Sequence, residues 1–282
     1  MQETKKLQLF AEEIRLETLK EFASLGFGHV GGSMSVIETL AVLYGSEMKV
    51  NPDNPRDPNR DYLVMSKGHA GPALYATLAL KGYFPKEMLL TLNKPATNLP
   101  SHCDRNKTPG IDMTTGSLGQ GMSSALGIAL GNRISGRDNY TYLIIGDGEC
   151  DEGQIWEGAL FAPQYKLDNL IAFVDANHQQ LDGYVKNVMD LGDLRGKFES
   201  FGWFTQEVNG HDVGQIADAV KLAKANKGKP SMIILDTEKG HGCWFAAGNE
   251  FNHHIAFKPE EIQRAIDEAE AAYKEASDAL SM

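Results

Sequence analysis

An acidic turn follows an apolar run in the stretch LIIGDGECDEGQIW, residues 143–156. It holds four carboxylates, at Asp147, Glu149, Asp151 and Glu152. Carboxylates repel one another and lose their hydration only at a large cost, so a buried turn of this kind needs a positive partner. Carboxylate oxygens are preferred ligands of hard divalent cations. The turn therefore indicates a metal site with Asp147 as a ligand, while Glu149 and Asp151 are interpreted as acids that favour a helix start.

A second polar segment follows the next apolar run, LIAFVD (170–175), and contains Asn177 and Gln179. Because neighbouring parallel strands end at the same edge of a sheet, we expect Asp147 and Asn177 to lie side by side. Their side-chain oxygens, a backbone carbonyl near Gln179, phosphate oxygens and a water would complete an octahedral site for Mg²⁺ or Ca²⁺. The alternative for Asn177 is a turn-forming residue after a strand.

The acidic turn does not fit two common nucleotide-binding motifs. The run GDGECDEG (146–153) lacks the G-x-G-x-x-G spacing of a dinucleotide fingerprint, and its acids would repel an unshielded pyrophosphate. It also lacks the Lys-Ser/Thr of a P-loop. A nicotinamide-dependent dehydrogenase is therefore disfavoured. A divalent cation bound to Asp147 would let the helix start accept phosphate groups.

Strand and helix patterns alternate along the chain and must position these residues. Apolar runs predict strands at 62–65, 140–145, 170–175, 204–208 and 231–236. Helices are predicted over 4–25, 36–47, 72–82, 119–132, 153–165, 190–200, 212–226 and 259–279, with a glycine-rich loop at 27–35 and an irregular segment at 93–120. This order predicts a doubly wound, mainly parallel α/β sheet with helices on both faces. We expect one domain over 1–282 with helical extensions at both ends.

Composition excludes several other classes. The formal net charge of -11 argues against nucleic acid as a partner, because phosphate backbones need a basic surface. The N-terminus is charged throughout and is not a signal peptide, and no uncharged apolar run reaches about 18 residues, so no membrane span is expected. Three widely spaced cysteines suggest reduced thiols rather than a disulfide framework. We expect a cytoplasmic protein.

Several segments together resemble the N-terminal region of transketolases, which use thiamine diphosphate. They are GHVGGSMS (28–35), NPDNPRDPNRDYLVMSKGHAGPALYATL (51–78), TTGSLGQGMSSALGIAL (114–130) and GDGECDEGQIWEGALFAPQYKLDNLIAFVDANHQQLDG (146–183). The last contains Gly-Asp-Gly, 28 further residues and then Asn177, which is similar to the thiamine diphosphate motif. The resemblance implies that thiamine diphosphate and Mg²⁺ (or Ca²⁺) are the cofactors.

The resemblance also implies roles for histidines. His29 would help deprotonate the donor ketose, His69 would contact the diphosphate, and His102 would contact a hydroxyl of the donor. A fourth catalytic and cofactor-contacting histidine is expected at His253, although the family usually has an aromatic residue where this chain has Asn252, and a second histidine follows at 254. The choice between the two histidines stays open at this point.

The remaining cofactor contacts implied by the resemblance are Gly116, Ser117, Leu118, Gly146, Asp147, Gly148, Glu149 and Asn177, with Asp147, Asn177 and Gln179 as metal ligands. Gly116, Ser117 and Leu118 would pass close to the cofactor rings, and Gly148 and Glu149 would offer backbone N–H groups to the diphosphate. Glu152 resembles a family glutamate that links two active sites across a subunit interface. Its alternative is an acid that stabilises a helix N-terminus.

Transketolases are much longer than this chain, and their second domain completes the active site. We therefore expect an N-terminal subunit completed by a separately encoded C-terminal subunit, in an α₂β₂ assembly acting on sugar phosphates. Xylulose 5-phosphate and ribose 5-phosphate are the default pair for the family. The alternatives are a transketolase-like enzyme for a non-standard sugar, a subunit of another thiamine diphosphate enzyme such as a 2-oxo-acid dehydrogenase, and a non-enzymatic cofactor-binding regulatory module.

Overall fold

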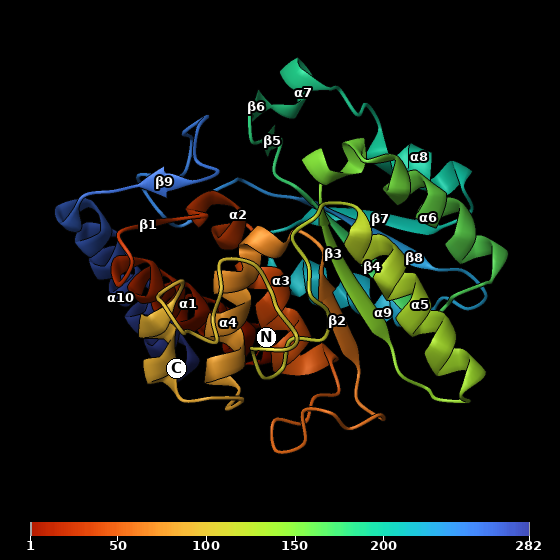
Figure 1. Cartoon of the computed structure of the whole chain (residues 1–282), viewed down its shortest axis with the longest axis horizontal. Helices are drawn as coiled ribbons and strands as arrows, with labels where there is room; N and C mark the ends of the chain where they lie inside the picture. Colours follow the sequence, from red (N-terminus) through yellow and green to blue (C-terminus); the bar gives the residue numbers. More distant parts are fainter. Residues whose placement is uncertain (1, 282) are drawn as a thin grey trace.

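A five-stranded parallel sheet forms the centre of the chain (Figure 1). The structure is a computed structural model and describes residues 2–281. The strands are β2 (Tyr62–Met65), β3 (Thr141–Gly146), β4 (Leu170–Ala176), β7 (Phe204–Asn209) and β8 (Ser231–Asp236). They lie in the order β2-β3-β4-β8-β7, and every neighbouring pair is parallel. All five carboxyl ends therefore meet at one edge, as the sequence predicts.

Helices cover both faces of this sheet, because the strands are apolar on both sides. Tyr142 and Ile144 of β3 belong to one core, whereas Leu143 and Ile145 belong to the other. The first core is covered by α1 (Gln2–Ala23), α3 (Ile37–Val42), α4 (Gly71–Leu80), α9 (Val213–Ala225) and α10 (Pro259–Ser281). The second is covered by α5 (Gln120–Ile134), α6 (Gly153–Gln164) and α8 (Leu194–Ser200). The predicted α/β class with helices on both faces is confirmed.

The first and last helices pack along each other on one side of the molecule (Figure 1). Lys5 Nζ of α1 donates to the carbonyl of Ala279 in α10 at 2.6 Å. Leu7, Ile14 and Leu19 of α1 are buried in the first core, and Ile262 of α10 joins them. The two ends of the chain are thereby held together. Within residues 2–281, no helix combines the length and apolarity needed to cross a membrane.

The glycine-rich segment 27–35 is not the loop that its composition predicts. It forms the short strand β1 (Phe27–Gly28), paired with β9 (Ile255–Ala256), and the one-turn helix α2 (Val30–Met34). Distant backbone groups supply the reason, since Gly31 N–H donates to the carbonyl of Asn252 and the Gly31 carbonyl accepts from Gly240 N–H. Local sequence propensity cannot reveal such partners.

Other elements differ from the predictions in detail. The predicted helix 36–47 ends as α3 at Val42 and continues as a π-helical turn, η1 (Leu43–Glu47). The helix expected from 190 begins only at Leu194, where the Asp193 side chain accepts from Gly196 N–H and caps it. Short elements that were not predicted are η2 (Gly68–Ala70), η3 (Lys86–Thr91), η4 (Gly148–Asp151), β5 (Gln179–Gln180), β6 (Gly183–Tyr184) and α7 (Val185–Val188).

Candidate active site

A cavity of about 340 Å³ lies at the carboxyl ends of β3 and β4. The expected site residues that line it are His69, His102, Gly116, Leu118, Gly146, Asp147, Gly148, Glu149, Glu152, Asn177, Gln179 and His253. Residues 92–119, which form no helix or strand, contribute three of them. Ser117 is exposed and is not part of the lining. The topology thus brings together side chains from both halves of the chain.

Asp147 and Asn177 follow neighbouring strands, as the sequence predicts. Gly146 of β3 lies opposite Asp175 of β4 in the sheet register. The Asp147 carboxylate is buried and accepts from Gly148 N–H at 2.8 Å and from His178 N–H at 2.6 Å. The Asn177 amide donates to Asp175 at 2.8 Å, which directs its oxygen away from that carboxylate. Two hard oxygen donors therefore face the same edge of the sheet.

The electrostatics of this pair favour a cation. Burial, and then the nearby Asp175 carboxylate, raise the pKa of Asp147 to about 7. A divalent cation would offset both effects and keep Asp147 ionised. The buried Gln179 side-chain oxygen has no hydrogen-bond partner among the described residues. Carboxylate, amide and carbonyl oxygens form the donor set that Mg²⁺ and Ca²⁺ prefer.

Five histidine rings form a cluster beside the cavity. The centre of the His29 ring lies 5.7 Å from that of His69, 5.3 Å from His102, 5.4 Å from His253 and 4.8 Å from His254. The His69 and His253 centres lie 4.6 Å apart. Three of these residues come from the first half of the chain and two from its end. The structure therefore brings together all four of the histidines expected to be catalytic.

Burial lowers the pKa of four of these histidines, His29, His69, His102 and His253, which favours their neutral form. It lowers the pKa of His29 to about 4, with smaller contributions from His254, His102 and Lys239. It lowers the pKa of His253 to about 3, aided by Lys239. The pKa of His69 lies well below its ordinary value, and that of His102 is also lowered. Neutral imidazoles can accept a hydrogen bond, so the cluster offers acceptors for the hydroxyl groups of a polyol.

His253 and His254 take different places. His253 lines the cavity, whereas His254 lies outside its lining, with its ring centre 5.5 Å from that of Phe27. The fully buried Asn252 fixes the segment before them. Its amide donates to the carbonyls of Lys239 and Ala246, both at 2.9 Å. Geometry therefore favours His253 as the cavity histidine.

Comparison with known proteins gives the family. A model described as "transketolase, thiamine diphosphate binding domain" matches residues 7–273. The chain is 54% identical over 264 residues to the 6-deoxy-6-sulfo-D-fructose transketolase subunit SqwG of Clostridium sp. (strain MSTE9), covering 94% of this chain and 96% of that protein. It is 39% identical over 241 residues to an apulose-4-phosphate transketolase subunit of Actinobacillus succinogenes, covering 86% and 87%. This chain belongs to the transketolase family.

Solved transketolases share its fold. The Pichia stipitis transketolase complex with sedoheptulose 7-phosphate aligns with a TM-score of 0.86 and 29% identity, covering all of this chain and 45% of that one. The Leishmania mexicana transketolase aligns with a TM-score of 0.85 and 30% identity, covering 98% and 45%. The chain thus spans less than half of these transketolases and nearly all of the subunit-type relatives. It corresponds to an N-terminal transketolase subunit.

Two buried lysines beside the cavity were not among the predicted site residues. Lys67 is ion-paired with Asp175, and both side chains are almost fully buried. Lys239 Nζ lies 3.3 Å from the Gln179 carbonyl and 3.3 Å from His253 Nδ1. Burial, and then Lys67, lower the pKa of Lys239 to about 8. One signal in the sequence pointed to Lys67, which lies two positions before the predicted site residue His69. The burial of Lys67 and Lys239 cannot be inferred from their spacing in the sequence.

These cations fit the anionic part of thiamine diphosphate. Lys239 forms no ion pair with a carboxylate among residues 2–281, and Lys67 is balanced only by Asp175. A diphosphate bridged to Asp147 by a metal would supply the missing negative charge. Glycine allows the close packing around this region: a Cβ on Gly32 would lie 2.7 Å from the His69 ring nitrogen Nε2. The residues present therefore fit both the cofactor and its metal.

Glu149 has a role that the sequence did not suggest. Its carboxylate is buried and accepts from Ser66 Oγ, from Gly119 N–H at 2.9 Å and from Gly146 N–H at 3.0 Å. The interpretation of its side chain as an acid that only favours a helix start is wrong, because it ties the ends of β2 and β3 to the start of α5. Glu152, in contrast, is exposed at the start of α6 and its side chain forms no capping hydrogen bond.

Proposed function

We propose that this chain is the N-terminal subunit of a thiamine diphosphate- and divalent metal-dependent transketolase, which transfers a two-carbon ketol unit from a ketose to an aldose. The observation that carries the proposal is the cluster of histidine rings beside the Asp147–Asn177 edge. A metal edge alone would suit many diphosphate-binding proteins. Several rings able to accept hydroxyl protons are what cleavage of a polyol requires.

Each group of residues has a task in this proposal. Bound thiamine diphosphate supplies the electron sink for the two-carbon fragment when the donor's C2–C3 bond breaks. Asp147, Asn177 and the Gln179 carbonyl would hold the cation that anchors the diphosphate. Lys239 would compensate the remaining phosphate charge. His29 receives the proton of the donor's C3 hydroxyl, so that the aldehyde can form and leave.

A separate C-terminal subunit would complete the site. Relatives that match this chain over nearly their whole length are named as subunits, and the single-chain transketolases are more than twice as long as the matched part. Two apolar side chains that line the cavity are exposed to solvent, Leu181 at 62% and Leu118 at 36%. We propose an α₂β₂ assembly in which Glu152 contacts a second copy of the chain.

The names of the relatives suggest a class of donor sugar. The relative with 54% identity is named for 6-deoxy-6-sulfo-D-fructose, and others are named for apulose 4-phosphate. We propose a ketose with an anionic group at its far end as the donor, and sulfofructose is the first to test beside xylulose 5-phosphate. We propose that the partner subunit supplies most of the positive charge for that group.

The test is a two-carbon transfer assay with thiamine diphosphate and Mg²⁺. The donors are sulfofructose and xylulose 5-phosphate, each offered with glyceraldehyde 3-phosphate and ribose 5-phosphate as acceptors. It is run on this chain alone and with the proposed C-terminal subunit added. Transfer only in the mixture, lost in His29→Asn, supports the proposal. Full-rate transfer by this chain alone would refute the need for a partner.

The same mixture separates the alternatives. Decarboxylation of pyruvate without ketol transfer would assign the chain to another class of thiamine diphosphate enzyme. Cofactor binding by calorimetry, with no turnover of any donor in the reconstituted complex, would indicate a regulatory module instead.

A further inference from the structure

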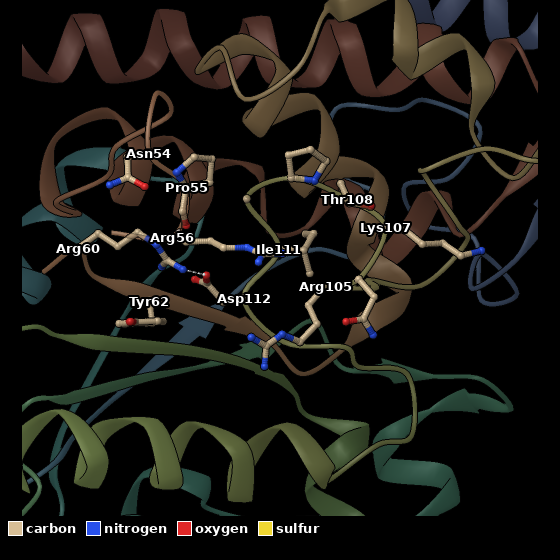
Figure 2. A pocket seen from close by; sticks show the side chains of 13 residues that line it. Asn54, Pro55, Arg56, Arg60, Tyr62, Arg105, Lys107, Thr108, Ile111 and Asp112 are labelled. Atoms are coloured by element: carbon tan, nitrogen blue, oxygen red, sulfur yellow. Dashed lines mark hydrogen bonds and ion pairs between the residues drawn. The ribbon is translucent and has the colours of Figure 1, made fainter. Parts of the chain in front are cut away.

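A second cavity, of about 790 Å³, lies between residues 54–62 and residues 105–112 (Figure 2). It shares no lining residue with the candidate active site. It lies beside the amino end of the edge strand β2, where Leu63 N–H donates to Asp112 at 2.8 Å. The candidate active site is at the carboxyl ends of the strands, so the two cavities are at opposite ends of the sheet.

The lining of this cavity is basic, although the chain as a whole has a net charge of -11. Arg56, Arg60, Arg105 and Lys107 line it against a single carboxylate, Asp112. Figure 2 shows the three arginines around Asp112, whereas Lys107 points away from them. An excess of positive charge in a concave part of an acidic protein indicates a site for an anion.

Asp112 cannot neutralise all three arginines. Arg60 is ion-paired with it, donates to the carbonyls of Pro55 at 2.7 Å and Asp61 at 2.8 Å, and lies 4.3 Å above the Tyr62 ring centre. Arg60 and the Leu63 N–H therefore occupy both oxygens of Asp112. Arg60 and Asp112 are thus a mostly buried, hydrogen-bonded pair in the cavity lining. Arg56 and Arg105 add two further cations to this lining.

The neighbouring acids do not balance those two arginines. Asp57 accepts from Asn59 N–H at 2.9 Å and Asp104 from Asn106 N–H at 2.9 Å, both within their own turns. Neither acid lines the cavity. Among the described residues, the Arg56 and Arg105 guanidinium groups form no side-chain hydrogen bond or ion pair. They are thus available to a ligand.

We propose that this cavity is a second ligand site, which binds a small molecule through a phosphate dianion held between Arg56 and Arg105. Guanidinium groups pair with phosphate oxygens in a bidentate fork, and two unpaired cations match the charge of a phosphomonoester. The volume is that of a metabolite site. Inorganic phosphate offers the same chemistry as a sugar phosphate, so the experiment distinguishes the two sources. The site does not depend on the proposed function, because it needs no turnover.

The test follows the reaction of arginines with phenylglyoxal in the full chain, mapped by peptide mass spectrometry in a phosphate-free buffer. Ribose 5-phosphate is expected to slow modification of Arg56 and Arg105 at least fivefold, while neutral ribose leaves their rates unchanged. Arg264, an exposed arginine of α10, is the internal control and keeps its rate. Stronger protection by ribose 5-phosphate than by inorganic phosphate identifies an ester as the ligand, and equal protection identifies free phosphate.

A variant gives a second readout. Arg56→Gln with Arg105→Gln changes two exposed side chains and is expected to abolish the binding of ribose 5-phosphate to this site, measured by calorimetry. The matched control, Arg264→Gln with Lys274→Gln on α10, removes the same charge and is expected to retain this binding. Absence of protection by either phosphate compound, equal slowing at Arg264, or unchanged binding by the double variant would each overturn the proposal.

Discussion

Replacing Glu149 by glutamine tests whether one buried carboxylate holds three segments of the site together. The change keeps the size of the side chain and leaves one oxygen able to accept from Ser66 Oγ and Gly119 N–H. The other oxygen, which accepts from Gly146 N–H, becomes an amide donor that faces a donor. One buried N–H is then left without a partner.

The magnitude follows from that single lost acceptor. Leaving a buried donor unsatisfied costs about 1–3 kcal/mol, and more where the partner was charged. Removal of a buried charge relieves some desolvation, because burial raises the pKa of Glu149 in spite of its three donors. We therefore expect Glu149→Gln to lower the free energy of unfolding by about 1–3 kcal/mol.

The measurement is urea unfolding followed by circular dichroism, with the free energy taken from the midpoint and the slope. Glu157→Gln is the matched control, since the Glu157 side chain is exposed on α6, and an exposed substitution of this kind stays within about 0.5 kcal/mol. If the two variants unfolded at the same midpoint, the three-donor network would not stabilise the fold and the reasoning would be refuted.

Three further predictions concern the charges around the cavity. Asp147→Ala should weaken Mg²⁺-dependent binding of thiamine diphosphate by about 100-fold or more, beyond the 10–100-fold typical of outer-shell groups. Calorimetry measures this affinity, with Asp138→Asn at an exposed position as the control. An unchanged affinity would show that Asp147 is not a metal ligand. Lys67→Met leaves Asp175 buried and unpaired, so the free energy of unfolding should fall by about 3–5 kcal/mol, with partial recovery when Asp175→Asn is added; equal stability of Lys67→Met and the unaltered chain would contradict it. The pKa of His29 is about 4 and that of His253 about 3, whereas a histidine in the unfolded chain has a pKa of about 6.5. Between about pH 6.5 and pH 4 the unfolded chain therefore binds more protons than the folded one, and the free energy of unfolding should decrease as the pH falls through this range. Scanning calorimetry should show a falling Tm with a shallower slope in His29→Asn, whereas a flat Tm would show that the buried histidines do not resist protonation.

The sequence by itself determined the sheet and the edge at which Asp147 and Asn177 lie. The apolar runs at 140–145, 170–175 and 231–236 are within one residue of β3, β4 and β8, because strands buried on both faces must be apolar throughout. Parallel neighbours end at one edge, so the strand pattern alone is enough to place Asp147 beside Asn177. The resemblance to transketolases added the histidines, whose roles no local pattern could supply.

Only the tertiary structure decided which polar groups support that edge. The helix in the glycine-rich segment, the cavity position of His253 and the burial of Lys67, Glu149 and Asp175 all depend on partners from distant parts of the chain. The Asp175 carboxylate, for example, accepts hydrogen bonds from Ser35 Oγ at 2.7 Å and from the Asn177 amide at 2.8 Å, and it forms an ion pair with Lys67. A buried charge is stable only when such partners surround it, and spacing along a sequence does not reveal which segments the fold brings together.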